Sequence, residues 1–243
     1  MNSSIQDSFN LGWKLALVEK GLSPKDILTT YNSERLPVIA KMLELTTKLL
    51  KKTVNEKADG EDASAWKRGG ELFQLGINYR WSEIVIDERT KQDNWVINPY
   101  GNEGDPLQAG DRAPEAPKLK DLRAATVDDA DVETSFFRIF SPAQHTALIF
   151  TNDPSRAAPV LDALDRYASG TVSSVLVLPK TAAAPLTVGK AGHVLKDTKG
   201  HAYEAYAVSE DGLTVVIVRP DGVIGEVALG AEGVERYRQL VFS

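Results

Sequence analysis

The stretch LTVVIVRPDGVIGEVAL, residues 213–229, carries the clearest fold signal in this chain of 243 residues. Two apolar runs, Leu213–Val218 and Val223–Leu229, lie on either side of an Asp221-Gly222 pair. Short apolar runs joined by an Asp-Gly turn are typical of a β-hairpin, because glycine adopts the backbone angles that a tight turn needs. The sequence therefore predicts two neighbouring antiparallel strands here.

The residues around this hairpin extend the pattern to a complete α/β unit. Thr146–Thr151 and Val172–Leu178 are short apolar runs typical of buried strands, and Pro154–Tyr167 between them places its apolar residues on one helix face. Gly233–Phe242 predicts a closing helix. The order strand–helix–strand, hairpin, helix is that of a thioredoxin-like fold. We therefore predict the α/β fold class, with a thioredoxin-like domain over residues 118–243.

Residues 1–52 predict helices without a sheet. The first helix has apolar residues on two faces at spacings of three and four, which is typical of a mostly buried helix, and it should end at Gly21. A second helix should begin at Pro24, because proline is favoured in the first helical turn. A third helix is predicted from Pro37 to about Lys51.

Residues 53–117 have the composition of a linker with one connecting strand. Asn55–Ser64 is polar and charged, which predicts an exposed loop. Gly76–Ile86 contains the predicted strand. Gly110–Pro117 predicts a stiff extended connector, because each proline restricts itself and the residue before it.

The composition excludes several classes of function. A net charge of -6 argues against nucleic acid or an anionic membrane as a partner. The absence of cysteine excludes disulfides, thiolate metal sites and thiol redox chemistry. His145, His193 and His201 are too far apart in sequence, and too far from carboxylates at ligand spacing, to predict a metal site. No run approaches the roughly 18–20 apolar residues of a membrane span, so we expect a soluble, cytoplasmic protein.

Five blocks of residues, in order along the chain, resemble one enzyme family. Met1–Leu15 is similar to the run Met-Asn-x-x-x-Gln-Asp-x-x-Asn-Leu-x-Trp-Lys-Leu that follows the second FAD-binding motif of flavoprotein aromatic hydroxylases. The later blocks are Tyr31–Pro37, Gly76–Ser82, Ala109–Pro114 and Arg219–Gly225. The resemblance is strongest to phenol 2-monooxygenases, the phenol hydroxylases, including their thioredoxin-like C-terminal domain. Each block alone is weak evidence, but five in the right order are strong.

This resemblance implies a flavin-dependent chemistry and a cofactor contact. In that family NADPH reduces FAD, the reduced flavin activates O2, and a phenolic or other aromatic substrate is hydroxylated. The first helix is expected to face the anionic edge of the reduced flavin, because the N–H groups at a helix start attract negative charge. By resemblance, the amides of Met1 and Asn2 contact that edge, with Ser3 behind them. No catalytic residue is expected within the chain.

The resemblance also implies that this chain is one part of such an enzyme. No Gly-x-Gly-x-x-Gly turn for the FAD pyrophosphate occurs in it, and the NADPH and substrate motifs of the family would precede Met1. We therefore expect the C-terminal part of the enzyme, inactive alone. The thioredoxin-like domain is expected to form a homodimer, with Thr214–Val218 and Val223–Leu229 as candidate edge strands.

Simpler interpretations stand beside these. Asn2 and Ser3 could merely cap a helix, and Trp13 is more typical of a core residue than of a flavin contact. Glu34 and Arg35 are adjacent, which is most often a surface ion pair. The alternative function is a non-catalytic thioredoxin-fold module for dimerisation or interaction, without redox activity. The opening block favours an enzyme, because a pure binding module has no need of a flavin-facing helix.

Overall fold

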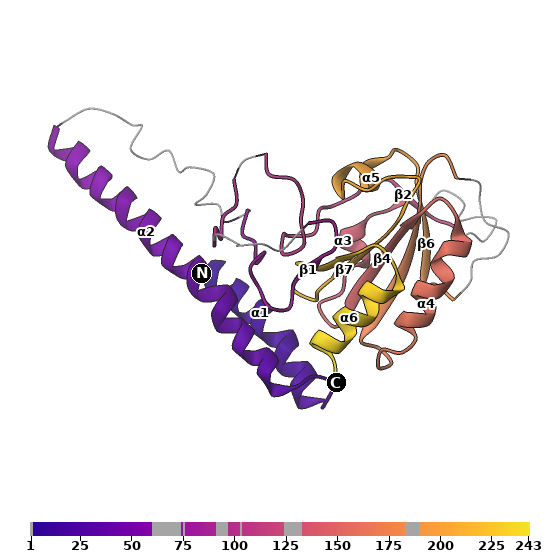
Figure 1. Ribbon diagram of the computed structural model, residues 1–243. Helices are drawn as coiled ribbons and strands as arrows, with labels where there is room; N and C mark the ends of the chain where they lie inside the picture. Colours follow the sequence, from indigo (N-terminus) through magenta and orange to yellow (C-terminus); the bar gives the residue numbers. More distant parts are fainter. Residues whose placement is uncertain are drawn as a thin grey trace.

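The computed structural model describes residues 2–59, 74, 76–90, 97–102, 104–123, 133–182 and 190–243, with side chains of the first segment described as far as Lys51. Figure 1 shows a long helix with a shorter one packed along its base, both beside an α/β domain. The chain's C-terminal end lies against the turn after the first helix. Ser243 N–H donates to the carbonyl of Leu22 (3.0 Å), and Ser23 Oγ donates to that of Val241 (2.6 Å).

Two helices and a short 3-10 turn form the N-terminal part. Helix α1 covers Asn2–Glu19 and ends before Gly21, whose positive φ of 67° glycine tolerates, as the sequence predicts. The 3-10 turn η1, Lys25–Leu28, leads directly into α2, Thr29–Asp59. The polar stretch expected as a loop over Asn55–Ser64 is therefore helical up to Asp59, and residues 60–64 lie outside the described residues.

The prediction of a separate helix starting at Pro37 is wrong, because Pro37 lies inside α2. A proline within a helix lacks the N–H that would bond the carbonyl four residues earlier, here that of Ser33. The indole N–H of Trp81 donates to the Ser33 carbonyl instead, at 2.9 Å. A side chain from a distant segment thus satisfies the carbonyl that the proline leaves free, and the helix continues.

Eight described strands form one sheet in the order β1-β8-β7-β4-β5-β6-β2-β3. The strands are β1 Ile86–Asp87, β2 Leu119–Asp121, β3 Glu133–Thr134, β4 His145–Thr151, β5 Val172–Leu178, β6 His193–Asp197, β7 Leu213–Val218 and β8 Ile224–Ala228. The remaining helical elements are α3 Phe136–Ile139, η4 Pro154–Ala157, α4 Ala158–Leu164, α5 His201–Ala205 and α6 Ala231–Val241.

The central strands confirm the thioredoxin-like topology. Strand β4 runs parallel to β5, with α4 between them in the chain, and antiparallel to β7. Leu148 of β4 faces Val175 of β5 on one side and Val216 of β7 on the other. Strand β8 then pairs antiparallel with β7, and α6 closes the unit. The sequence did not predict β6 or α5, because short strands and one-turn helices lack a clear hydrophobic period.

The expected strand over Gly76–Ile86 is wrong except at its last residue. Hydrogen bonds from Ser82 N–H to the Tyr79 carbonyl and from Val85 N–H to the Ser82 carbonyl make turns there. Only Ile86–Asp87 extends, and it pairs parallel with β8. Strands β7 and β8 are consequently interior strands, and the described edges are β1 and β3. The expectation that β7 or β8 offers a free edge to a partner is therefore also wrong.

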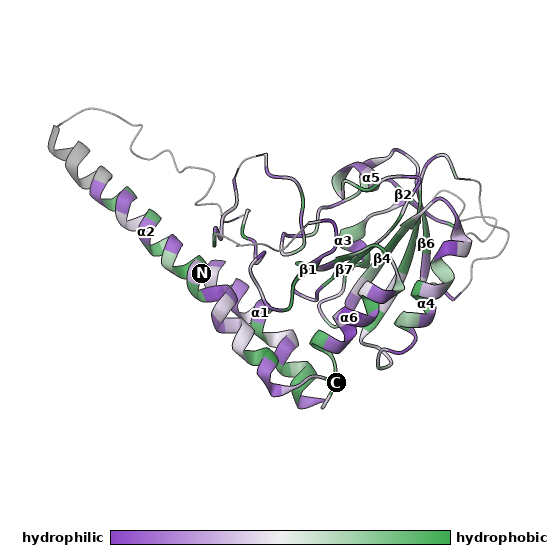
Figure 2. Cartoon of the chain, in the orientation of Figure 1, coloured by the Kyte–Doolittle hydropathy of each residue, from purple (hydrophilic) through white to green (hydrophobic). Residues whose placement is uncertain are grey.

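The sheet buries an apolar core on each face. On one face, Leu164 of α4 and Val234 of α6 cluster with Ile149 of β4, and α1 adds Trp13 to the same cluster. The opposite face holds Phe136 of α3 with residues of α5 and of the connector. Figure 2 shows the hydrophobic colour concentrated along the central strands, as two covered faces require.

The connector over Gly110–Pro117 begins with a turn at Gly110 and a bend at Asp111, and from Arg112 on it has no helix and one isolated bridge, to Val223. Gly110 N–H donates to the Ile224 carbonyl (2.7 Å), and the Gly110 carbonyl accepts from Tyr79 N–H (2.8 Å). The same stretch holds Ala113 and Ala116, which are buried. The backbone hydrogen bonds of Gly110 therefore join the segment near Tyr79 to strand β8.

Candidate functional site

The start of α1 presents free hydrogen-bond donors. The first four N–H groups of a helix have no acceptor within it, so those of Asn2, Ser3 and Ser4 are available. The Asn2 side chain is exposed. The Ser3 hydroxyl is occupied, since it donates to Met42 Sδ (3.1 Å) and accepts from the Gln74 amide (3.3 Å). Met1 lies outside the described residues.

Further along α1, Asn10 and Lys14 are hydrogen-bonded to a buried carboxylate. Glu34 of α2 is fully buried and accepts five hydrogen bonds from four side chains. We call Glu34 and these four side chains the Glu34 network. The donors are Lys14 Nζ (2.8 Å), Asn10 Nδ2 (2.5 Å), Ser82 Oγ (2.6 Å) and the two terminal nitrogens of Arg219 (2.7 and 3.0 Å). The network joins α1, α2, the turn segment near Ser82 and the β7–β8 hairpin, and its Glu34–Arg219 pair alone spans 185 residues of sequence.

The charges of this buried region balance. Arg219 also pairs with Asp221, through bonds of 3.0 and 2.5 Å, and Asp221 accepts the indole N–H of Trp13 at 3.3 Å. Two cations therefore face two carboxylates. The Arg219 guanidinium lies over the rings of Trp13 and Tyr79, 5.2 and 5.6 Å from their centres. Balanced charge with hydrogen bonds to every member is the condition under which burial of ions is tolerated.

The same contacts keep these groups ionised. Burial alone would raise the pKa of Glu34, but the charges of Arg219 and Lys14 outweigh it and lower that pKa to about 2. Burial, together with the charge of Arg219, lowers the pKa of Lys14 to about 8. Both groups are thus charged at neutral pH. A carboxylate this enclosed and fully bonded cannot exchange protons with a substrate, so the Glu34 network positions the elements around it.

Arg35 makes a second, separate anchor. Its Nε pairs with Asp7 at 2.6 Å, and one terminal nitrogen donates to the Tyr79 hydroxyl at 2.9 Å. Arg35 is 2% exposed, and it bonds none of the Glu34 oxygens. The interpretation of Glu34 and Arg35 as a surface pair is therefore wrong. Neighbouring positions of a helix point in different directions, so each reaches its own partners.

The sequence of this chain is similar to those of several known proteins. A family described as an FAD binding domain matches residues 1–46. A flavin-dependent monooxygenase of Mycobacteroides abscessus is 39% identical over 116 residues, 48% of this chain and 20% of that protein. A pentachlorophenol 4-monooxygenase of Sphingobium chlorophenolicum is 31% identical over 122 residues, 48% of this chain and 21% of that protein. A phenol 2-monooxygenase of Aspergillus fumigatus is 24% identical over 261 residues, 94% of this chain and 42% of that protein.

The chain is related to FAD-dependent aromatic hydroxylases. It spans 20%, 21% and 42% of the length of these three relatives and corresponds to their C-terminal portion. The flavin-dependent monooxygenase PieE, solved with FAD and substrate, superposes with a TM-score of 0.66 at 21% identity, covering 98% of this chain and 43% of PieE. Aklavinone-11 hydroxylase, solved with FAD and aklavinone, gives 0.65 at 22% identity, covering 99% and 40%. At such identities the likeness shows the fold.

The sequence of this hydroxylase relative predicts little of the Glu34 network. Lys14 lies in the first matching block and Arg219 and Asp221 in the last, and neither block indicates a charge partner. One signal was available, because Lys14 follows Trp13 on a helix that is apolar on two sides. A charged residue in such a position must find a partner, and Asn10 and Lys14 are one turn apart.

The three histidines of this relative of the hydroxylases lie on separate elements, β4, β6 and α5. No group of three or more potential ligands comes together among the residues that the structure describes. His145 is buried between the rings of Trp13, Tyr237 and Phe242. Burial and the charge of Arg219 lower the pKa of His145 to about 3, so it is a neutral core residue. None of the described helices is long and apolar enough to span a membrane.

A buried carboxyl group without a hydrogen-bond partner lies under α6. Glu226 of β8 is fully buried, and neither of its oxygens has a hydrogen-bond partner in the described part of the chain. Burial raises its pKa to about 8, the charge of Glu88 adds to the rise, and Arg236 opposes it. Glu226 is therefore largely protonated at neutral pH, unlike Glu34.

Glu226 should make the fold less stable at alkaline pH. The folded protein holds the proton up to about pH 8, whereas the unfolded chain releases it near the ordinary value of 4.5. Stability should therefore fall as pH rises through this interval, by up to about 1.4 kcal/mol per unit. In urea unfolding between pH 5 and 9, Glu226→Gln should reduce this slope. The exposed Glu232→Gln should keep it, and an unchanged slope in Glu226→Gln would contradict the assignment.

Proposed function

We propose that this chain is the C-terminal portion of an FAD- and NADPH-dependent monooxygenase that hydroxylates phenolic or other aromatic substrates. The observation that carries the proposal is the match of an FAD-binding domain family to residues 1–46, the segment that the Glu34 network anchors. The sequence blocks similar to phenol 2-monooxygenases support the finer assignment. Residues 1–52 would complete the FAD-binding domain, 53–117 would connect, and 118–243 would form the thioredoxin-like domain.

The cofactor contact would lie at the start of α1. FAD supplies the redox chemistry of such enzymes, and the protein supplies binding and orientation. The free N–H groups of the first turn suit an anionic flavin edge, so the amides of Met1 and Asn2 would hold it. Ser3 would contribute through its backbone, since its hydroxyl already bonds Met42 and Gln74. The Glu34 network and Arg35 would keep this turn in place.

Removing one backbone donor tests the contact. Proline is tolerated in a first helical turn but lacks the N–H, so Asn2→Pro should weaken FAD binding at least tenfold, and Ser4→Pro should weaken it far less. Both changes would be made in a chimera in which this chain replaces the corresponding portion of the Aspergillus fumigatus relative. Flavin fluorescence quenching measures binding, and NADPH oxidation with phenol measures activity.

The chimera also tests the proposed function itself. It should retain FAD and couple NADPH oxidation to phenol hydroxylation, whereas this chain alone should do neither. Equal losses in Asn2→Pro and Ser4→Pro would show that α1 acts only through its fold. Micromolar FAD binding by the chain alone would contradict the proposal that further residues are required.

The alternative is a non-catalytic thioredoxin-fold module, and the family match at residues 1–46 favours the enzyme over it. A homodimer through residues 118–243 is compatible with either function. It would use apolar surface, such as Phe137 at 59% exposure and Leu229 at 53%, since β7 and β8 offer no free edge. Light scattering after size exclusion should give twice the mass of the chain, and a strict monomer at high concentration would exclude the dimer.

A further inference from the structure

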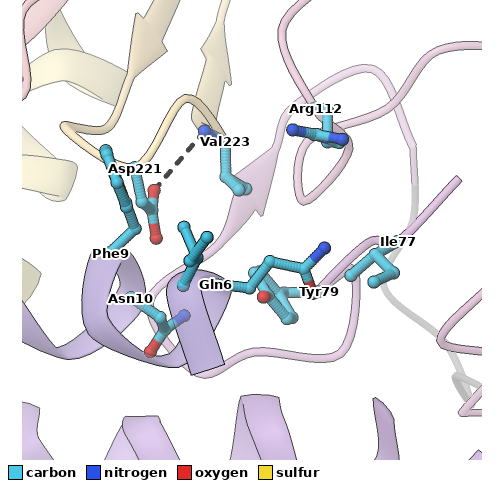
Figure 3. Close-up of a pocket in the computed structure, with 9 residues that line it drawn as sticks. Gln6, Phe9, Asn10, Ile77, Tyr79, Arg112, Asp221 and Val223 are labelled. Atoms are coloured by element: carbon cyan, nitrogen blue, oxygen red, sulfur yellow. Dashed lines mark hydrogen bonds between the residues drawn. The ribbon is translucent and has the colours of Figure 1, made fainter. Parts of the chain in front are cut away.

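A hollow of about 240 Å³ lies between α1, the segment near Tyr79 and the β7–β8 hairpin. Figure 3 shows Gln6 extending from α1 with its amide nitrogen towards the side where Arg112 lies, whereas the Asn10 side chain points away from both. It begins one helical turn beyond Asn2, and it contains none of the residues proposed to hold the flavin.

The walls of this hollow suit a small ring. Ile5, Phe9, Ile77 and Val223 supply apolar surface, and Tyr79 adds a second aromatic face. Cavities of about 150 Å³ with apolar walls bind benzene, so 240 Å³ accommodates one substituted ring. Aromatic side chains favour aromatic ligands through edge and offset contacts.

The polar groups of the hollow decide the charge of the ligand. Both oxygens of Asp221 are already bonded, to Arg219, Trp13 and the Val223 N–H. Asn10 uses its amide nitrogen on Glu34 and its oxygen on Lys14. These two residues therefore have little capacity left for a ligand.

The unused groups are all donors. The guanidinium of Arg112 has no ion pair or hydrogen bond within the described residues, and its backbone is held by pairing with Val223. The Gln6 oxygen accepts from Arg35, which leaves the Gln6 NH2 group free. The Tyr79 hydroxyl accepts from Arg35 and keeps its own proton to donate. Hydrogen-bond donors without acceptors at the edge of an apolar hollow favour a ligand that carries an anionic group.

We propose that this hollow binds a small aromatic carboxylate, with the ring against Phe9, Ile77 and Val223 and the carboxylate towards Arg112 and Gln6. The site is independent of the flavin contact at the start of α1, and it stands whether or not the hydroxylase function does. Because Arg112 is exposed, its attraction for the carboxylate is screened by salt.

Benzoate tests the proposal directly on this chain. In titrations followed by backbone-amide NMR, benzoate should bind with a dissociation constant of about 1 mM or below. The shifts should be largest at Gln6, Phe9 and Val223. Benzamide lacks the charge and acetate lacks the ring, so each should bind at least fivefold more weakly. Added salt should weaken benzoate and leave benzamide unchanged.

Two variants at exposed positions distinguish the contribution of the Arg112 charge to binding from that of the apolar walls. Arg112→Gln should weaken benzoate at least fivefold without affecting benzamide, and Phe9→Ala should weaken both. Arg166→Gln, at an exposed arginine on the thioredoxin-like domain, serves as the matched control and should change neither. Circular dichroism would confirm that each variant folds. The proposal fails if benzoate does not saturate, if its shifts lie elsewhere, or if Arg112→Gln binds it as well as the unchanged chain.

Discussion

Replacing Glu34 with alanine is expected to lower the free energy of unfolding by about 3–5 kcal/mol. The change leaves Lys14 and Arg219 buried without the carboxylate that both of them face. Asn10 and Ser82 lose their acceptor at the same time. Removing one partner from a buried ion pair costs more than the pair itself contributes, because the remaining charge stays out of water.

Urea unfolding followed by circular dichroism measures this loss. Glu34→Gln keeps the shape and one acceptor oxygen, so it should lie between the alanine variant and the unchanged chain. Glu44→Ala is the matched control, because Glu44 is on the same helix and pairs with Lys41 and Lys48 in solvent. We expect no resolvable change there. Equal effects at positions 34 and 44 would show that the Glu34 network does not hold α1 and α2 to the sheet.

Replacing Gly110 with alanine is the second change expected to have a large effect, about 2–5 kcal/mol. Gly110 has a φ of +94°, which disfavours any residue with a Cβ. That Cβ would also lie 2.5 Å from the backbone nitrogen and Cα of Arg80. Backbone atoms cannot move aside as a flexible side chain can, so the connector would have to leave Ile224 or Tyr79, to which Gly110 is bonded.

A second glycine distinguishes the cost of the positive φ from the cost of the close approach to Arg80. Gly104 has a similar φ of +83°, but an added Cβ there would meet nothing within 4 Å. Gly104→Ala should therefore show the conformational cost alone, about 1 kcal/mol. The difference between the two variants in thermal unfolding measures the close approach at Arg80. Equal effects would mean that this approach relaxes without cost.

The features that the sequence predicted are those that neighbouring residues determine. Strands β4, β5 and β7 are runs of apolar residues, and burial on both faces of a sheet requires that composition whatever the partner strands are. The Asp221-Gly222 turn specifies the hairpin locally, since Gly222 adopts a φ of +76°. The order of these elements was then enough for the thioredoxin-like topology. The matching blocks likewise indicated the relation to aromatic hydroxylases.

Other features depended on residues far apart in the chain. Pro37 indicates a helix start when seen alone, but α2 continues through it, and the indole N–H of Trp81 bonds the Ser33 carbonyl that the proline leaves free. Strand β1 is two residues long, too short for a hydrophobic period, yet its pairing with β8 removes the expected free edge. Both outcomes involve hydrogen bonds between segments that local patterns cannot relate.

The anchoring of α1 shows the same division. By itself, the sequence determined that residues 2–19 are helical and that Trp13 lies in the core. The prediction that this helix is mostly buried is wrong, because Ile5, Phe9 and Leu15 are 52%, 53% and 47% exposed. Only the tertiary structure decided that Glu34 faces Lys14 and Arg219 and that Arg35 turns to Asp7. An ion's partner is chosen by distance and desolvation in the folded protein, and Arg219 lies 185 residues from Glu34 in the chain. The spacing of charged residues along the sequence therefore does not predict which of them pair.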